Sequence, residues 1–572
     1  MKLFSRLVVL LVAVFLCVQT SLAEPARATV RVGLWTLWRD REVAVAAARS
    51  TATVKLCATC SAERLIDGSA KMDRAGLLWI SSGHTRIVSE IDFAGGLKLK
   101  AHGETVVLAW PVRVRSAHGV LEIVATVPVE RYVEMAVAAE SGPADSEESR
   151  KALAVVARSF ALDHTERHAG FDVCDSTHCQ WVRWRSSAEA HAATLATAGE
   201  SLWLKGARMG AYFHQNCGGR TAAASEIWPG RAEQAGLLSI ADPYCVRMGS
   251  SDWSAQMTLG ELTEALAREG LAAPGWKTLR VVERGGSGRA MVVDVGGTRI
   301  PAESFRLAVG RTLGWDRIRS DWFEVSAAGD GFVFHGRGTG HGVGLCQAGA
   351  AEMAREGLGY REILAQYFPT AQIADVATGR PWQRIVAKGF ILETNVRDDA
   401  QFVPELSHAL EAAESRSGLH SGGTLTVRAY GSTPAFRDAT LAPGWVAAFT
   451  EDDRIALQPL RVLAGRKLLF STALHEFLHV LVEEQATMAT PLWLREGLVE
   501  ALAGEAASGP RPAITPEQAN RELAAARTEA ESVAAHRAAG WYVRRLLDRY
   551  GRGQVIEWLR AGPPQALVDL LR

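Results

Sequence analysis

The feature that most constrains this 572-residue chain is the run His475-Glu476-Phe477-Leu478-His479, inside an apolar segment that begins at about Leu468. The apolar residues predict a buried helix, and histidines four positions apart lie on one face of a helix. Two imidazoles on one face can bind one zinc ion, with Glu476 beside them as the base toward an attacking water. The segment therefore predicts a metal site on a helix in the C-terminal part of the chain.

A second helical segment carries a candidate third metal ligand. It reads PLWLREGLVEALAG and places Glu496 seventeen positions after His479. The WLREGLVEAL portion resembles the second zinc helix of gluzincins, whose third ligand is the Glu of Glu-Gly-Leu. The resemblance covers about residues 389–572, is closest to small peptidase-MA-like domains, and implies a catalytic zinc held by His475, His479 and Glu496. Glu500, one helical turn later, would be an outer-shell partner.

The same resemblance suggests one more catalytic residue. His536 precedes WYVRRLLDRYG, where these domains often carry a Tyr or His that stabilises the oxyanion. The alternative is a solvated helix histidine. For the domain as a whole, the alternative is a zinc site that is structural or catalytically silent.

The first residues predict export. Lys2 and Arg6 are basic, Leu7–Val18 is apolar, and Ser21-Leu22-Ala23 forms a small-x-small cleavage site. This order is typical of a signal peptide over residues 1–23, and the apolar stretch is short for a membrane span, although a retained anchor is the alternative. The chain also has 63 basic and 63 acidic residues, so it has no net field to recruit nucleic acid.

The length and the apolar content of 48% predict two or three globular domains. Alternating apolar and polar residues over 28–130 predict strands, whereas SEESRKALAVVARSFALDH (146–164) predicts a helix. Another helix is expected over roughly 348–367. FILETNV, TLTVRAY and WVAAF then read as three strands ahead of the histidine-bearing helix, with WVAAF as an edge strand that could align a peptide.

We therefore predict an α+β fold in two domains. The first, residues 24–376, is a mixed β-rich domain with helices, and the second, residues 389–572, is a small α+β zincin-like domain. Gly and Pro interrupt the pattern over 377–388, which we interpret as a linker.

The N-terminal domain carries a candidate acid. Glu140 stands at the end of a short apolar helix, just before Gly142 and Pro143. Flanking Ala and Val residues would raise its pKa and keep it protonated for general-acid work. The alternative is an exposed glutamate at a helix end.

A cysteine- and histidine-rich loop follows. Two cysteines and two histidines that could form a tetrahedral zinc site lie within twelve residues: His168, Cys174, His178 and Cys179. A Cys174–Cys179 disulfide with solvated histidines is the alternative. Cys57 and Cys60 form a separate CATC pair, for which a local disulfide is favoured over metal binding.

Two glycine-rich segments complete the N-terminal motifs, YFHQNCGGRTAAASEIW (212–228) and GRGTGHGVGLCQAGA (336–350). Paired glycines let a backbone approach a ligand closely. Neither segment has the GK[ST] of a phosphate-binding loop, so nucleotide binding is disfavoured.

In this order, the N-terminal motifs resemble the stage II sporulation protein D family over roughly residues 28–375. The matching motifs are VPVERYV, a Glu before Pro, ALAVVARSFA, CGG, DPYC and GHGVGLCQAGA. The resemblance implies a peptidoglycan lytic transglycosylase with Glu140 as its acid. The chain reads Glu-Ser-Gly-Pro where the family has Glu-Met-Pro, which puts the local loop geometry in doubt.

The resemblance also assigns the other residues. It implies a structural zinc on the loop from His168 to Cys179, and it places His341 and Gln347 near the glycan. Cys217 of CGG and Cys245 of DPYC would form a disulfide.

Together, these resemblances imply an exported cell-wall enzyme with zinc in both domains, a peptidoglycan substrate for the first and a peptide or protein substrate for the second. The alternative is a module that binds glycan without cutting it and targets the peptidase to the wall. Amidase-enhancer proteins share the N-terminal motifs, so a cell-wall amidase is a further candidate partner.

Overall fold

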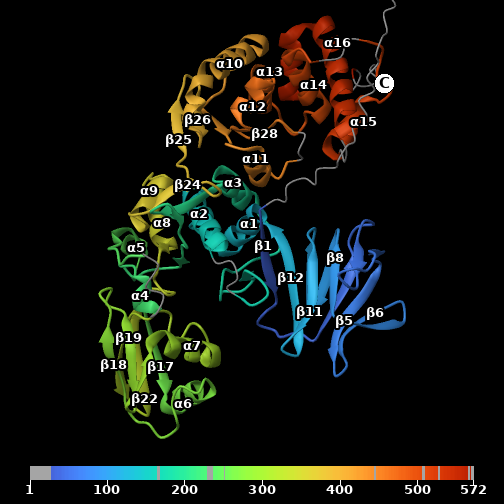
Figure 1. Ribbon diagram of the computed structural model, residues 1–572. Helices are drawn as coiled ribbons and strands as arrows, with labels where there is room; N and C mark the ends of the chain where they lie inside the picture. Colours follow the sequence, from blue (N-terminus) through green and yellow to red (C-terminus); the bar gives the residue numbers. More distant parts are fainter. Residues whose placement is uncertain are drawn as a thin grey trace, which may run out of the picture.

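The computed structural model of the protein describes residues 28–163, 168–228, 236–249, 251–442, 446–505, 509–525, 529–564 and 567. The predicted signal peptide lies outside these residues. The chain is mixed α+β, with a β-rich N-terminal region, a central group of helices, a lower lobe and an upper C-terminal domain (Figure 1). Within the described part of the chain, no helix is long and apolar enough to cross a membrane.

Two sheets form the N-terminal region and pack face to face (Figure 1). The first has the order β13 (Val173–Cys174), β1 (Thr29–Leu34), β12 (Val120–Pro128), β11 (Val112–Ala117), β8 (Glu90–Ala94), β3 (Thr53–Lys55) and β4 (Glu63–Arg64). The second has the order β10 (Glu104–Leu108), β9 (Leu97–Ala101), β2 (Glu42–Ala47), β5 (Asp67–Asp73), β6 (Gly76–Ser81) and β7 (His84–Val88). Their alternating residues are buried on one face, which confirms the strand prediction over 28–130.

The central helices are continuous with this sandwich, because β12 leads directly into α1 (Val129–Glu140). α2 (Glu147–Asp163), the helix predicted from the apolar stripe, is buried over most of its length. The other elements of this region are α3 (Ala188–Ala196), α8 (Gln347–Arg355), α9 (Tyr360–Tyr367) and a sheet in the order β15 (Ala207–Arg208), β14 (Glu200–Leu204) and β24 (Gln372–Asp375).

The helix predicted over 348–367 is in fact two helices. α8 ends at Arg355, the backbone of Gly357 takes a positive φ of 89°, and Gly359 then caps α9. A residue with a Cβ is strained at such a φ, so the glycines stop the first helix and start the second.

A lobe over residues 252–337 has its own hydrophobic core around Phe305, Phe323 and Phe334. It consists of β17 (Asp252–Thr258), α6 (Leu259–Arg268), β18 (Leu279–Arg284), β19 (Ala290–Val295), β20 (Thr298–Pro301), α7 (Ala302–Leu313), β21 (Phe323–Ala328) and β22 (Gly331–Arg337). The sequence did not predict a separate unit here. Short elements flank the lobe in the sequence: β16 (Phe213–His214), α4 (Ala224–Ile227) and α5 (Pro243–Arg247) precede it, and β23 (Leu345–Cys346), which pairs with β16, follows it.

The C-terminal domain is a five-stranded sheet covered by helices. The sheet order is β25 (Gln383–Val386), β26 (Phe390–Thr394), β27 (Leu425–Ala429), β29 (Arg454–Leu457) and β28 (Ala448–Glu451). The three middle strands are parallel and both edge strands are antiparallel. The helices are η1 (Arg397–Phe402), α10 (Val403–Ser417), α11 (Thr433–Thr440), α12 (Leu460–Gly465), α13 (Leu469–Glu483), α14 (Leu492–Ala503), α15 (Pro516–Ala525) and α16 (Glu529–Ala561).

The junction between the central region and this domain is tightly packed. β25 lies inside the predicted linker 377–388, and Trp382 is buried there. Arg428 on β27 donates to the buried carboxylate of Glu200 on β14 at 2.9 Å and stacks on the Trp382 ring at 3.9 Å. The predicted linker is therefore part of a buried interface between the two bodies.

Candidate active sites

Glu140, the predicted acid, lies where three segments meet. It is the last residue of α1, and its Oε1 accepts a hydrogen bond from the Trp181 amide at 2.8 Å. The side chain of Gln347, the first residue of α8, donates to the Glu140 carbonyl oxygen at 2.9 Å. The structure thus brings two of the predicted residues together, and Gln347 acts on the backbone of Glu140.

The environment of Glu140 suits a proton donor. Burial raises the pKa of Glu140 to about 6, although the hydrogen bond from the Trp181 amide lowers it. A carboxyl with this pKa carries its proton at mildly acidic pH, unlike an exposed glutamate. The alternative of an exposed glutamate at a helix end does not describe this side chain.

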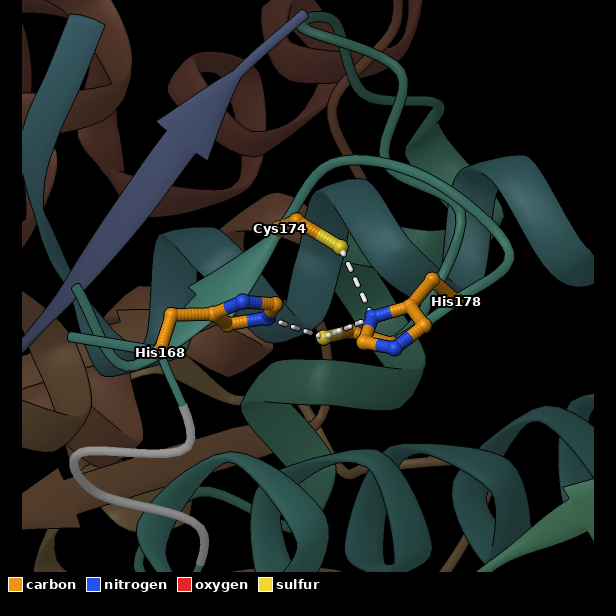
Figure 2. A group of neighbouring side chains, drawn as sticks. His168, Cys174 and His178 are labelled. Carbon is orange, nitrogen blue, oxygen red and sulfur yellow. Dashed lines mark hydrogen bonds between the residues drawn. The ribbon is translucent and has the colours of Figure 1, made fainter. Parts of the chain in front are cut away.

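The predicted zinc ligands converge next to Glu140. Figure 2 shows His168, Cys174 and His178 with their side chains directed toward a shared space. The Cys179 sulfur is 3.2 Å from His168 Nε2 and 3.7 Å from His178 Nδ1, which is also 3.7 Å from the Cys174 sulfur. Sulfur and nitrogen ligands of one tetrahedral zinc would be about 3.6 Å apart, so these donor atoms fit such an ion.

The loop that carries these ligands is anchored on both sides of the cluster. Cys174 lies on β13, which pairs with β1, and Gln180 accepts a hydrogen bond from the buried Tyr132 hydroxyl of α1 at 2.8 Å. The neighbouring Cys179, together with the two histidines, holds the pKa of the Cys174 thiol well below its usual range despite burial. Trp181 follows Cys179 by two residues, so the amide that donates to Glu140 lies on the same loop as the cluster.

His341 lies among aromatic rings. Its ring lies against those of Tyr212, His214 and Trp228, with centroids 5.1–6.2 Å apart, and its Nδ1 accepts a hydrogen bond from the Val343 amide at 3.1 Å. Burial lowers the pKa of His341 well below its usual value, so the ring is neutral. Its predicted role near the glycan stays a prediction.

The cysteine predictions have two outcomes. Cys57 and Cys60 form a disulfide, as favoured from the sequence. The expected disulfide between Cys217 and Cys245 is wrong in this structure, because both thiols are free and buried. Cys346 lies in the same group of side chains, so neither thiol has a single partner.

The C-terminal site has the donor atoms that a zinc ion requires. His475 and His479 on α13 point their Nε2 atoms at each other across 3.0 Å, and His479 Nε2 is 3.5 Å from Glu496 Oε2 on α14. Nitrogen and oxygen ligands of one tetrahedral zinc are about 3.3 Å apart, so these two separations are compatible with a shared ion. The donor atoms that all lie within 4.8 Å of one another here are those of His475, Glu500 and Glu505, so the predicted set of three ligands stays a prediction. Burial alone would raise the pKa of Glu496, but the hydrogen bond from His536 and the nearby His479 lower it to about 2.

An outer carboxylate orients His475. Glu505 Oε2 is 3.0 Å from His475 Nδ1, which leaves Nε2 free to face the metal position. The sequence pointed to Glu500 for this role, and Glu500 does lie in the same group of side chains. Glu505 was missed because it follows the helix end, where Gly504 in the left-handed conformation turns the chain back.

The remaining residues of the site line a cavity of about 710 Å³. Glu476 Oε2 accepts a hydrogen bond from the Thr450 hydroxyl of the edge strand β28 at 2.6 Å. His536 Nε2 is 3.5 Å from Glu496, while its Nδ1 is 2.8 Å from the Ser532 carbonyl oxygen. The structure therefore places both predicted catalytic residues at the same cavity as the predicted ligands.

Comparison with known proteins supports the N-terminal resemblance. Residues 117–203 match the family model of the stage II sporulation protein. Stage II sporulation protein D of Bacillus subtilis is 26% identical over 299 residues, which cover 49% of this chain and 83% of that protein. An uncharacterised protein of Brachyspira hyodysenteriae is 29% identical over 259 residues, 43% of this chain and 67% of that protein. Residues 250–344, close to the bounds of the separate lobe, match a domain of unknown function (DUF8618).

Proposed function

We propose that the chain is an exported cell-wall enzyme that cleaves peptidoglycan glycan strands as a lytic transglycosylase and also carries a zinc peptidase domain. The observation that carries the glycan activity is the half-buried carboxyl of Glu140, whose pKa is raised to about 6 and whose Oε1 accepts a hydrogen bond from the Trp181 amide, while Gln347 donates to its main-chain carbonyl oxygen. The match to the stage II sporulation protein model, which includes Glu140, supports the same assignment.

One carboxyl is enough for this reaction. Hydrolytic glycosidases need two carboxyl groups, one as acid and one as base or nucleophile. In the proposed reaction Glu140 protonates the leaving glycosidic oxygen as the bond to the anomeric carbon breaks. The 6-hydroxyl of muramic acid then bonds to that carbon and gives its proton to Glu140, so the acid is regenerated and the product ends in a 1,6-anhydro sugar.

Trp181 is well placed to hold the sugar. Its side chain is 42% exposed although its own amide binds Glu140, and the Arg183 guanidinium lies 4.6 Å from its ring. Exposed aromatic rings present a flat apolar face that a sugar ring can cover. We assign Trp181 as the platform for the residue beside the cleaved bond.

The test is to digest purified peptidoglycan with the full chain and to analyse the products by mass spectrometry. A transglycosylase generates 1,6-anhydro-muramic ends, whereas a module that only binds glycan or activates an amidase leaves the glycan intact. Sedimentation with insoluble peptidoglycan in the same samples measures binding separately.

The pH profile of glycan cleavage should report the Glu140 acid. Because the reaction starts with a protonated carboxyl, kcat/KM should be constant at low pH and fall about tenfold per pH unit above a pKa near 6. Initial rates of anhydro-end formation between about pH 5 and 8 would show this. A rate that rises through pH 6 would contradict the assignment.

The zinc position on the loop from His168 to Cys179 should support Glu140 without taking part in the chemistry. Four protein ligands leave no open position on a tetrahedral ion. Cys174→Ser should therefore lose one zinc per chain and lower kcat of glycan cleavage, because the Trp181 amide would no longer be fixed against Glu140. Metal analysis paired with the product assay checks this, and loss of metal with full activity would contradict it.

The C-terminal cavity is the proposed peptidase site. A zinc ion bound by His475, His479 and Glu496 would supply Lewis-acid activation of a peptide carbonyl. Glu476 would remove the proton from the attacking water, and His536 would donate a hydrogen bond to the developing oxyanion. The unpaired edge of β28 beside Glu476 offers backbone groups to an extended peptide.

A further inference from the structure

Three buried thiols and one carboxylate lie together in the central region, away from both zinc positions described above. The members are Cys217, Asp242, Cys245 and Cys346, and one donor atom from each lies within 4.8 Å of all the others. Each of the four side chains is at most 1% exposed. From this geometry we infer a further metal site, a closed zinc site with three cysteine ligands and one aspartate ligand.

The spacing selects a single ion. Two sulfur ligands of one tetrahedral zinc lie about 3.8 Å apart, and a sulfur and an oxygen ligand about 3.6 Å apart. The Cys217 sulfur is 3.1 Å from Asp242 Oδ2, and no two of the four donor atoms are more than 4.8 Å apart. Four donors at this spacing surround the volume of one metal ion.

Outer hydrogen bonds already orient the donors. The Tyr367 hydroxyl donates to Asp242 Oδ2 at 2.8 Å, and the Cys245 amide donates to Asp242 Oδ1 at 2.9 Å. The Cys346 sulfur accepts from the amides of Cys217 and Gly349 at 3.2 and 3.4 Å. Metal ligands typically have such partners, and amide donors stabilise a thiolate.

The charge balance also favours a cation. Asp242 is fully buried, and the donors that the structure gives it are neutral groups, namely the Tyr367 hydroxyl, the Cys245 amide and the Cys217 thiol. A buried carboxylate is costly unless a positive charge lies close to it. The guanidinium of Arg289 comes close, but it donates to the backbone carbonyl oxygens of Cys217 and Arg220, at 2.7 and 2.9 Å. A divalent ion would offset two of the four negative charges that Asp242 and the three thiolates would carry. A single disulfide would leave the third thiol and the carboxylate without a cation.

The position of the site connects it to the proposed acid, Glu140. The ligands join three separate segments: the CGG loop, the start of α5 and the end of β23. Cys346 directly precedes Gln347, whose side chain binds the Glu140 carbonyl oxygen. The ion would therefore fix the segment that supports the proposed acid. The site also requires a glycine at position 349, because a Cβ on Gly349 would overlap the Tyr367 hydroxyl and the Asp242 carboxylate.

The test is zinc analysis of the full chain purified without chelator. With both sites described above also filled, wild type should hold three zinc ions per chain, and Cys346→Ser and Asp242→Asn should each hold two. The matched control is Cys57→Ser/Cys60→Ser, which removes two cysteines from an exposed disulfide and should keep all three ions. An unchanged zinc count in Cys346→Ser would overturn the proposal.

A second measurement on wild type guards against variants that fail to fold. Native protein is treated with an alkylating reagent before and after chelation, and labelled cysteines are identified by peptide mass spectrometry. Protection of Cys217, Cys245 and Cys346 that is lost on chelation supports the site. A disulfide between any two of them in the metal-replete protein overturns it. Neither readout depends on glycan or peptide cleavage, so both stand apart from the proposed activities.

Discussion

Glu140→Gln should lower formation of 1,6-anhydro-muramic ends by about 10²- to 10⁴-fold, the usual contribution of a positioned general acid. The amide cannot give a proton to the leaving oxygen, but it keeps the size of the carboxyl and can still accept the hydrogen bond from the Trp181 amide. The fold and the affinity for glycan should therefore be unchanged. Product analysis measures the first effect, and sedimentation with peptidoglycan measures the second.

The matched control is Glu189→Gln, an exposed glutamate in the first turn of α3. It changes the same chemical group on the same region and should keep wild-type turnover. Wild-type turnover in Glu140→Gln would remove Glu140 from the mechanism. Absence of anhydro ends even with wild type, together with retained glycan binding, would favour the binding-module alternative.

The sequence was informative wherever spacing alone determines geometry. Histidines at 475 and 479 share a helix face in any helix, so their convergence needed no tertiary information. The four candidate ligands from His168 to Cys179 are likewise close in the sequence, and their donor atoms lie together in the structure. Glu140 was identified through its motif, and the fold supplies the burial that raises its pKa.

Contacts between distant segments could not be predicted in this way. Trp181 and Gln347 reach Glu140 from 41 and 207 residues away. The Cys217 prediction was wrong because a pairwise pattern, CGG with DPYC, did not reveal that Cys346 joins the same group. Glu505 reaches His475 only because the chain reverses at Gly504.

Domain boundaries were the weakest part of the sequence analysis. The lobe over residues 252–337 has strands and turns like those before it, so no change of composition marks its start. At the other boundary, Gly and Pro suggested a linker at 377–388, yet Trp382 is buried against Arg428. Composition does not distinguish a flexible connection from a turn that is buried at an interface.

Glu476→Gln should abolish peptide hydrolysis, with an expected loss of at least about 10²-fold, and leave zinc content unchanged. In the proposed mechanism Glu476 is the base and is not among the expected ligands, so the amide of the variant should leave metal binding intact. The Thr450 hydroxyl can still donate to the amide oxygen, which preserves the contact between α13 and β28. Hydrolysis of a peptide library and metal analysis of the same preparation measure the two effects. Loss of the zinc along with the activity would show that Glu476 is a ligand.

Glycan cleavage by Glu476→Gln tests whether the two sites work separately. The bodies are joined by the buried Arg428–Glu200 contact, and His191 on α3 bridges Glu134 of α1 and Glu451 of β28 at 3.1 and 3.2 Å. These contacts fix the bodies relative to each other, but within the described part of the chain the hydrogen bonds of Glu140 and Glu476 go to different partners. We therefore expect wild-type glycan cleavage in Glu476→Gln and wild-type peptide hydrolysis in Glu140→Gln. If either folded variant lost both activities, the two sites would be coupled, and the chain of contacts through His191 would be the first route to interrupt.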